Sequence, residues 1–271
     1  MESKFSVLIS LYNKEKEEYL KNSLESVFNQ TLIPAEVIVV FDGPVSKALE
    51  EVVWDFKNKY SSLSIIKLEK NSGLGNALQI GIQHCKYDII ARMDTDDINY
   101  KNRFEKQISF LASNPNLSVV GSYVQEFQRV PQDINVYRKL PIDIFELLRF
   151  SKYRNPLNHP SVMFRKSDVL SVGSYQHMPL FEDYYLWIRL LKKGYKIANL
   201  AEALLHFRIG NDMIGRRHGF SYLQKEIRFL KAAKQIGHIN NIQYIKSLAI
   251  KLPLRLLPKS ILRYIYKIFL R

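Results

Sequence analysis

The chain has 271 residues, of which 46% are hydrophobic and 24% are charged. This mixture is typical of a folded globular protein and excludes a largely disordered chain. The 40 Lys and Arg residues outnumber the 26 Asp and Glu residues, and the formal net charge of +14 favours an anionic partner such as a phosphate, a nucleic acid or a lipid headgroup. A single cysteine, Cys85, excludes an internal disulfide framework and a zinc site of several thiolates.

The first hundred residues alternate between strand and helix periodicities. Short apolar runs predict strands over residues 5–11, 36–41, 64–68 and 87–93. Helical spacing of apolar residues predicts helices between them, over 15–28, 45–60 and 74–85. Such alternation predicts a Rossmann-like α/β domain, in which a mostly parallel sheet is flanked by helices.

Beyond residue 100 the pattern is less regular. It predicts helices over 101–113, 142–151 and 182–193, and strands over 118–124 and 161–165. Residues 1–220 carry 29 basic and 25 acidic side chains, whereas residues 221–271 carry 11 basic side chains and one acidic side chain. We therefore expect a single domain over 1–220, followed by a basic helical tail over 221–271.

Polar residues follow each of the first four predicted strands. In a parallel sheet the carboxyl ends of the strands meet at one edge, which is where such sheets bind ligands. The candidates are Ser10, Tyr12 and Asn13 after the first strand, Asp42 and Gly43 after the second, Asn71 to Gly75 after the third, and Asp94 to Asp97 after the fourth. The sequence therefore predicts one shared binding edge.

The most informative motif is the acidic cluster at Asp94, Thr95 and Asp96. Neighbouring carboxylates repel one another, so the cluster favours a cation with a preference for oxygen ligands, such as Mg²⁺ or Mn²⁺. The alternative is a solvated acidic turn before the next helix. Asp42 with Gly43 also allows two interpretations: a carboxylate that binds a ribose or a base, or a turn that needs these residues for its backbone.

Residues 71–75 open a predicted helix with two glycines. They allow a nucleotide to approach the backbone, or they simply cap the helix. The segment does not match G-x-G-x-x-G, because residue 78 is Leu, and no G-K-S/T follows. Dinucleotide and P-loop interpretations therefore lose their support.

Glu182 and Asp183 begin another predicted helix. Acids in a first turn interact favourably with the helix dipole, which is a sufficient structural reason for both. The alternative is that one of them is a general base that takes a proton from an acceptor hydroxyl.

Five segments, taken in order, carry a resemblance to a known family. They contain Ser10, Tyr12 and Asn13; Val40 to Gly43; Asn71, Gly73, Gly75, Asn76 and Ala77; Arg92 to Asp97; and Glu182 with Asp183. This order resembles the family 2 glycosyltransferases of the GT-A fold over about residues 5 to 210. Residues 159–163 add a further match to bacterial polysaccharide enzymes of the amylovoran and O-antigen type.

The resemblance implies the activity. It implies inverting transfer of a hexose, with glucose or galactose favoured, from a UDP-sugar to a glycan on a lipid diphosphate such as undecaprenyl diphosphate, forming a β-glycosidic bond in surface polysaccharide synthesis. The implied cofactor is Mn²⁺ or Mg²⁺. The nucleotide-sugar half would extend to about residue 97 and the acceptor half over about 98–220.

The resemblance also implies the roles of single residues. Tyr12 and Asp42 would contact the nucleoside, Asp94 the ribose, and Asp96 the metal. Asp183 would be the catalytic base, and His159, Glu182 and Trp187 would face the acceptor. Ser10, Asn13, Gly43, Asn71, Gly73 and Arg92 would complete the donor-binding set.

Two positions depart from the family pattern. The usual pair of acids after the second strand is here Phe41 and Asp42, and no histidine follows Arg208 closely. His218 or Asp212 would be the nearest substitute for a distal ligand, and a surface role is the simpler expectation for both.

The tail carries a cation at every fourth residue, from Lys251 to Arg271, between apolar residues. Pro253 and Pro258 are expected to break it into short helical pieces. Basic amphipathic segments of this kind lie on anionic membrane surfaces. The alternative is a C-terminal helix that packs on the domain with solvated lysines.

These patterns also suggest a location and competing functions. Because the first residues lack the apolar region of a signal peptide, we expect a cytoplasmic protein at the inner face of the cell membrane. A magnesium-dependent nucleotidyltransferase or phosphohydrolase is the alternative enzyme. A nucleic-acid-binding protein is the alternative binding function, although the cations lie mainly in a leucine- and isoleucine-rich tail, so we expect no nucleic-acid partner.

Overall fold

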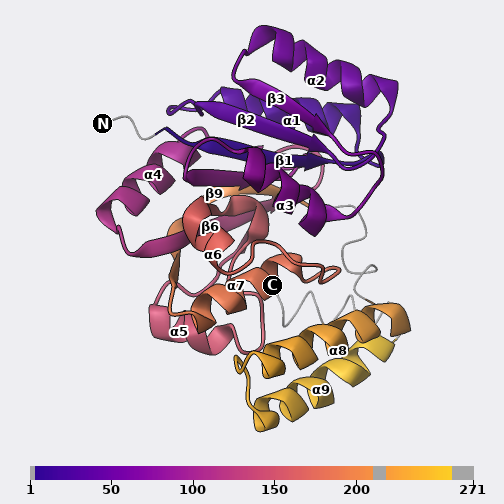
Figure 1. Ribbon diagram of the computed structural model, residues 1–271, viewed down its shortest axis with the longest axis vertical. Coiled ribbons are helices and arrows are strands. Elements are labelled where there is room, and N and C mark those ends of the chain that lie inside the picture. The colour runs from indigo at the N-terminus through magenta and orange to yellow at the C-terminus, as the bar shows by residue number, and fades with distance from the viewer. Residues whose placement is uncertain (1–3, 210–217, 258–271) are drawn as a thin grey trace.

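In the computed structural model, which describes residues 4–209 and 218–257, the early apolar runs form the parallel half of one sheet (Figure 1). These strands are β1 (Ser6–Leu11), β2 (Glu36–Phe41), β3 (Leu63–Lys67) and β4 (Ile89–Met93), in the order β3-β2-β1-β4. Leu11 pairs with Phe41 and Ile9 pairs with Met93. The carboxyl ends of β1, β2 and β4 therefore lie at the same edge, as predicted.

The second half of the sheet is mixed. Continuing from β4, the order is β8 (Met163–Arg165), β6 (Leu117–Phe127), β9 (Lys196–Arg208) and β5 (Ile98–Asn99), while β7 (Val136–Arg138) pairs with β6. β8 is antiparallel to β4 and to β6, whereas β9 is parallel to β6. The prediction of a mostly parallel core flanked by helices is confirmed.

The long strand β9 was not predicted from the sequence. Its middle residues, Ala201 and Glu202, are exposed, and its pairing with β6 shifts register near Ser122 and Tyr123. These irregularities interrupt the alternation that identifies a strand in a sequence.

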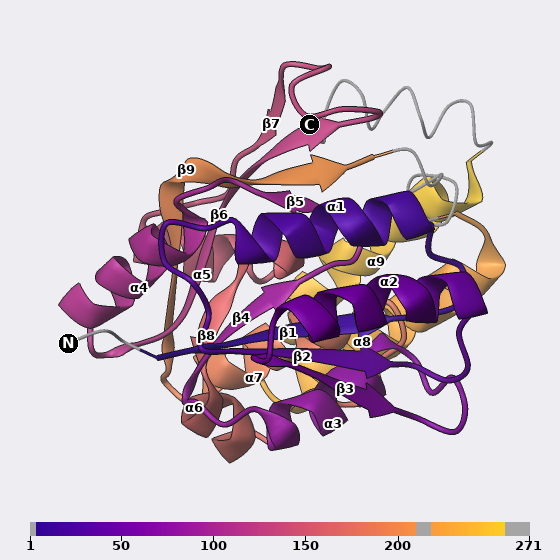
Figure 2. The same cartoon turned by 90° about the horizontal axis from the view of Figure 1, so that it is seen from above.

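Helices cover both faces of the sheet and create two separate apolar cores (Figure 2). One face carries α1 (Glu17–Phe28), α2 (Lys47–Lys59) and α4 (Arg103–Ser113). The other carries α3 (Leu74–His84), α5 (Ile144–Phe150), α6 (Lys166–Ser171) and α7 (Glu182–Lys192). The short 3-10 helix η1 (His159–Ser161) precedes β8.

The segment after the sheet is a helical hairpin, α8 (Phe220–Gln235) and α9 (Asn241–Leu256). A third apolar cluster joins α7 to α8 through residues such as Tyr184, Ile188 and Phe229. The hairpin therefore packs on the domain. Pro253 does not break the helix as expected, since it lies exposed in the last turn of α9, where its missing N–H removes only one intrahelical bond.

The cations of the hairpin are not all solvated, which corrects the expected stripe. The buried carboxylate of Glu226 accepts hydrogen bonds from Arg255 Nε at 2.7 Å and Nη2 at 3.1 Å, and Lys251 Nζ lies 3.0 Å away. These partners outweigh burial and hold the pKa of Glu226 below its ordinary value. Within the described residues, no helix has both the length and the apolar character needed to cross a bilayer.

Candidate active site

Asp42 and Gly43 follow β2 and contact the residues just before α3. The buried carboxylate of Asp42 accepts hydrogen bonds from the backbone N–H of Ser72 at 2.7 Å and of Gly73 at 3.0 Å. Gly43 has φ +84°, and a Cβ there would lie 2.4 Å from the backbone nitrogen of Asn71. The structural interpretation therefore accounts for both residues, and contact with a nucleoside stays a proposal that uses the remaining lone pairs of Asp42.

The residues that follow β1 are more exposed than Asp42, which follows β2. Ser10 is partly buried at the end of that strand, whereas Tyr12 and Asn13 are exposed just beyond it. The backbone N–H of Asp42 donates to the carbonyl of Leu11 at 2.8 Å. The loops after β1 and β2 are thus held side by side, with Tyr12 accessible to a ligand.

Arg92 brings a buried positive charge to this edge. Its side chain is almost fully buried in β4, and Nη2 forms an ion pair with Asp94 Oδ1. Its Nε and Nη1 have no hydrogen-bond partner among the described residues. Burial lowers the pKa of Arg92, but the attraction of Asp94 outweighs it, so the pKa is raised overall and the group stays charged.

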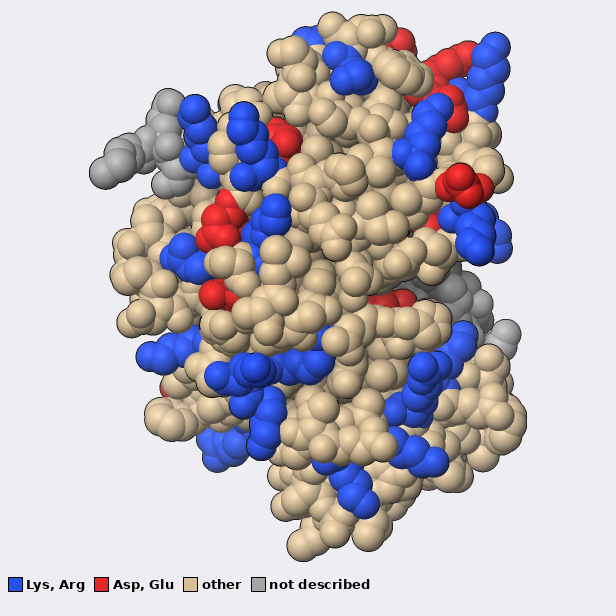
Figure 3. All heavy atoms as spheres, viewed as in Figure 1, with Lys and Arg blue, Asp and Glu red and all other residues tan. Residues whose placement is uncertain are grey.

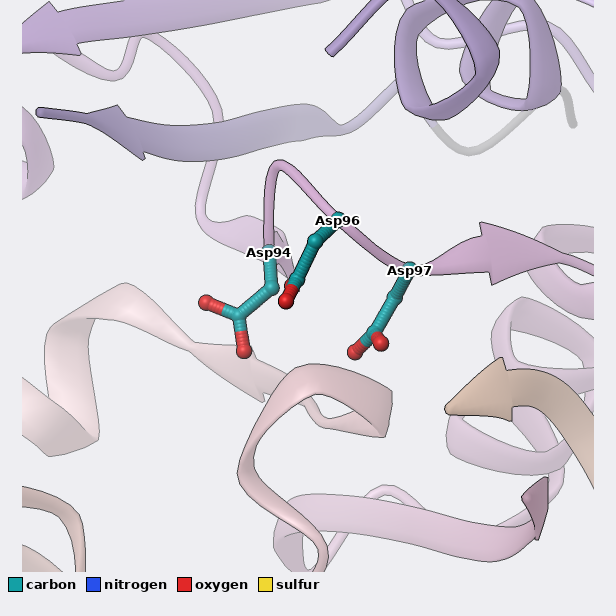
Figure 4. A group of neighbouring side chains, drawn as sticks. All are labelled: Asp94, Asp96 and Asp97. Atoms are coloured by element: carbon teal, nitrogen blue, oxygen red, sulfur yellow. The ribbon is translucent and has the colours of Figure 1, made fainter. Parts of the chain in front are cut away.

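Three carboxylates meet directly after β4 (Figure 4). One oxygen of each of Asp94, Asp96 and Asp97 lies within 4.8 Å of the others. Burial, followed by repulsion from Asp94 and Glu15, raises the pKa of Asp96 to about 7. Burial likewise raises the pKa of Asp97, whose Oδ2 has no hydrogen-bond partner among the described residues. A divalent cation with oxygen ligands fits this set, because it would offset the repulsion that these shifts report.

The end of β9 closes over this cluster. The backbone N–H of Arg208 donates to Asp97 Oδ1 at 2.8 Å, and its Nε donates to the carbonyl of Asp96 at 2.9 Å. The guanidinium lies 3.7 Å from the ring centroid of Tyr19. Sequence reasoning placed no function on Arg208, because the strand that carries it could not be recognised.

Glu182 and Asp183 lie at the start of α7, as predicted. Asn155 Nδ2 donates to Asp183 Oδ2 at 2.5 Å. Burial outweighs this hydrogen bond, so the pKa of Asp183 is raised above its ordinary value. Glu182 packs against the start of α3, where a Cβ on Gly75 would lie 2.7 Å from its Cγ. The starts of α3 and α7 therefore meet.

Electrostatics connect these groups into one site. Arg92 acts on both Asp94 and Asp183, and the buried hydroxyl of Tyr175 is influenced by both carboxylates. Asp42 joins the same region indirectly, because it holds the start of α3. These charge interactions support the predicted gathering of strand-end acids with the start of α7, which stays a proposal, and Tyr175, which sequence reasoning missed, interacts with both groups.

His159 and Trp187 lie behind this surface. His159 Nε2 is 2.7 Å from the hydroxyl of Tyr175, and burial followed by the charge of Arg92 lowers the pKa of His159. Trp187 is fully buried, with its ring centroid 6.1 Å from that of His159. The expected direct contact between Trp187 and an acceptor is therefore corrected: apolar packing in the second core places this side chain out of reach.

Of the two substitutes expected for a distal ligand, only His218 lies within the described residues. His218 Nε2 lies 2.7 Å from the carbonyl oxygen of Leu257, so it links the start of α8 to the end of α9. Asp212 lies outside the described residues.

Glu182→Gln is expected to raise thermal stability near pH 8 and to leave it unchanged near pH 4. Burial raises the pKa of Glu182 to about 7, so unfolding releases a proton between about pH 4.5 and pH 7, and stability falls as the pH rises through that window. The neutral amide of Gln removes the free-energy cost of burying the ionised carboxylate, which is roughly 1–3 kcal/mol, or a few degrees in Tm. Melting curves at both pH values test this, with the exposed Glu51→Gln as the control.

Comparisons with known proteins agree with this geometry. The family model "Glycosyl transferase family 2" matches residues 6–173. The amylovoran biosynthesis glycosyltransferase AmsE of Erwinia amylovora is 42% identical over 266 residues, covering 97% of this chain and 98% of AmsE. An Escherichia coli UDP-Gal:alpha-D-GlcNAc-diphosphoundecaprenol beta-1,3-galactosyltransferase is 36% identical over 268 residues, covering 99% of this chain and 97% of that enzyme.

A solved structure shows the same fold. TarS of S. aureus in complex with UDP-GlcNAc superposes with a TM-score of 0.68 at 18% identity, covering 92% of this chain and 71% of that one. The GT-A fold is thereby confirmed. The family match replaces the nucleotidyltransferase and phosphohydrolase alternatives. The chain belongs to glycosyltransferase family 2, alongside enzymes of bacterial polysaccharide synthesis.

Proposed function

We propose that this enzyme transfers a hexose, glucose or galactose, from a UDP-sugar to a glycan carried on a lipid diphosphate, in the synthesis of a bacterial surface polysaccharide. The observation that supports it most is the acidic cluster directly after β4, together with Arg92, which forms an ion pair with Asp94 and whose charge also acts on Asp183 at the start of α7. The activity that names the galactosyltransferase relative supports both the donor and the lipid-linked acceptor.

The donor side consists of the strand ends. Tyr12 and Asp42 are proposed to contact the nucleoside and Asp94 the ribose. Ser10, Asn13, Gly43, Asn71, Gly73 and Arg92 are proposed to complete the donor-binding set. The buried charge of Arg92 supports this role, since its Nε and Nη1 have no hydrogen-bond partner among the described residues and its charge acts on both Asp94 and Asp183.

The acidic cluster is proposed to hold Mn²⁺ or Mg²⁺, with Asp96 as a ligand. When bound, such a cation supplies charge neutralisation for the departing nucleoside diphosphate. The carboxylates themselves fit such a cation: one oxygen of each lies within 4.8 Å of the others, and the pKa of Asp96 is raised to about 7.

Asp183 is proposed as the general base. Its raised pKa makes it a better proton acceptor than an ordinary aspartate, and Asn155 fixes one of its oxygens. A hydroxyl activated there attacks the anomeric carbon opposite the leaving group. Such a single displacement inverts the centre, so an α-linked donor gives a β-glycoside. His159 and Glu182 are proposed to border the acceptor.

A donor screen tests this proposal. UDP-glucose, UDP-galactose, UDP-GlcNAc, GDP-mannose and dTDP-glucose are each incubated with the protein, MnCl₂ and a GlcNAc-diphospho-lipid analogue, and products are detected by mass spectrometry. We expect one hexose to be added from a UDP-hexose, with the β configuration visible in the NMR coupling constant. Transfer only from a GDP- or dTDP-sugar, or an α-linked product, would contradict the proposal.

A further inference from the structure

The outward side of α9 is apolar, although it faces solvent. Ile242, Ile245, Ala249, Leu252 and Leu256 are all exposed, and we call them the α9 outer face. Ile242 is 76% exposed and Ile245 is 64% exposed. The spacing of three, four, three and four residues places all five on one side of the helix. No described residue covers this row.

The exposed charged side chains of the described hairpin are all basic. Exposed cations of the hairpin are Arg228, Lys231, Lys234 and Lys246. The one acidic residue of the hairpin, Glu226, is 2% exposed and forms ion pairs with Arg255 and Lys251. Figure 3 shows basic and no acidic side chains over α8 and α9 on the face in view. The hairpin thus combines an aliphatic stripe with unneutralised positive charge.

From this combination we infer that the α9 outer face docks on an anionic lipid bilayer. Convex aliphatic side chains flanked by lysine and arginine enter the boundary between headgroups and acyl chains. Anionic headgroups attract the neighbouring cations, and the attraction adds to apolar burial. The bilayer contact is argued independently of the proposed function. Its purpose, which is to bring the enzyme to a lipid-linked acceptor, rests on the proposed function.

Charge argues against other occupants. A second copy of the same hairpin would bring two basic surfaces together with no exposed carboxylate to pair them. Residues 258–271 carry four further cations and no Asp or Glu, so they would meet the same repulsion. A folded protein partner would need to supply a groove for a convex helix, whereas a bilayer accommodates any such face.

The packing of the hairpin connects the bilayer contact to the active site. Phe181, Tyr184 and Ile188 of the α7 region pack with Phe229 and Leu230 of α8. Glu182 and Asp183 are the first two residues of α7. Docking through α9 would therefore hold the candidate base in a fixed relation to the membrane, as a lipid-linked acceptor requires.

Vesicle co-sedimentation of the full chain tests the inference. We expect wild type to bind phosphatidylglycerol vesicles and to bind phosphatidylcholine vesicles far more weakly. Ile242→Ser with Ile245→Ser is expected to lower the partition coefficient by about tenfold or more. Lys231→Gln with Lys234→Gln is expected to lower it by about fivefold for each cation. The matched control is Ile33→Ser with Ile142→Ser, two isoleucines that are 54% and 51% exposed elsewhere.

Three results would overturn the inference. The first is no binding of wild type to phosphatidylglycerol vesicles. The second is that Ile242→Ser with Ile245→Ser binds these vesicles as well as wild type does. The third is a wild-type dimer in sedimentation velocity that Ile242→Ser with Ile245→Ser converts to a monomer. The melting-temperature gain with UDP and Mn²⁺ is measured on every variant. An unchanged gain shows that the protein is folded, and it separates failure of the bilayer contact from failure of the proposed function.

Discussion

Asp183→Asn is expected to lower kcat for sugar transfer by about 10²- to 10⁴-fold and to leave the affinity for the UDP-sugar nearly unchanged. The amide has the shape of the carboxylate, and its oxygen still accepts the hydrogen bond from Asn155. It cannot take up the proton of the attacking hydroxyl. Because the donor is proposed to lie on the strand ends, its binding should not depend on this group.

Single-turnover transfer and isothermal titration with the UDP-sugar measure the two effects separately. The control is Asp168→Asn, which removes an acid from the first turn of another helix, α6, and therefore matches the loss of a favourable helix-dipole interaction. We expect it to retain wild-type turnover. Full turnover in Asp183→Asn would refute the assignment of the base, and a parallel loss of donor affinity would make Asp183 part of the donor site instead.

The first half of the fold was predictable because each element there carries a local signal. The apolar run ending at Phe41 is buried on both faces, as its continuous β-branched residues indicate, and Asp42 with Gly43 ends it. The positions of Asp94, Asp96 and Asp183 followed, since strand ends and helix starts determine where such side chains lie. Boundaries differ from the prediction by at most two residues in these strands and helices.

The remaining features depend on contacts between distant segments, which periodicity does not encode. Trp187 occupies a position that can face either an acceptor or the second core, and only the packing against His159 decides between them. Arg208 reaches Asp96 and Asp97 from over a hundred residues away. Tyr175 stands in a loop with no recognisable pattern, yet its hydroxyl lies 2.7 Å from His159 Nε2.

The tail shows the same limit in electrostatic terms. Its charge count predicted a basic surface, but which cations face solvent depends on Glu226, whose buried carboxylate draws Lys251 and Arg255 inward. A helical period alone assigns all cations to one drifting stripe. The fold instead neutralises two of them and leaves the aliphatic side of α9 outside.

Asp96→Asn is expected to abolish the gain in melting temperature that UDP with Mn²⁺ gives the wild-type protein. A ligand at about 100 times its Kd stabilises by ~2.7 kcal/mol, which for a chain of this size raises Tm by roughly 5–10 °C. The amide keeps the volume of the side chain but removes a negative charge from the acidic cluster. Without that charge the diphosphate of UDP meets two remaining carboxylates with weaker compensation, so its binding is lost.

Differential scanning fluorimetry with UDP alone, Mn²⁺ alone and both together measures this coupling. Asp55→Asn, which removes an exposed carboxylate from α2, should retain the full gain. Adding EDTA to wild type should reproduce the behaviour of the Asp96 variant, because either change removes the cation from the cluster. If Asp96→Asn keeps the gain while EDTA removes it, the cation is held by Asp94 or Asp97 instead. If neither change affects the gain, the acidic cluster binds no cation and Arg92, whose Nε and Nη1 have no hydrogen-bond partner among the described residues, becomes the counter-charge for the diphosphate.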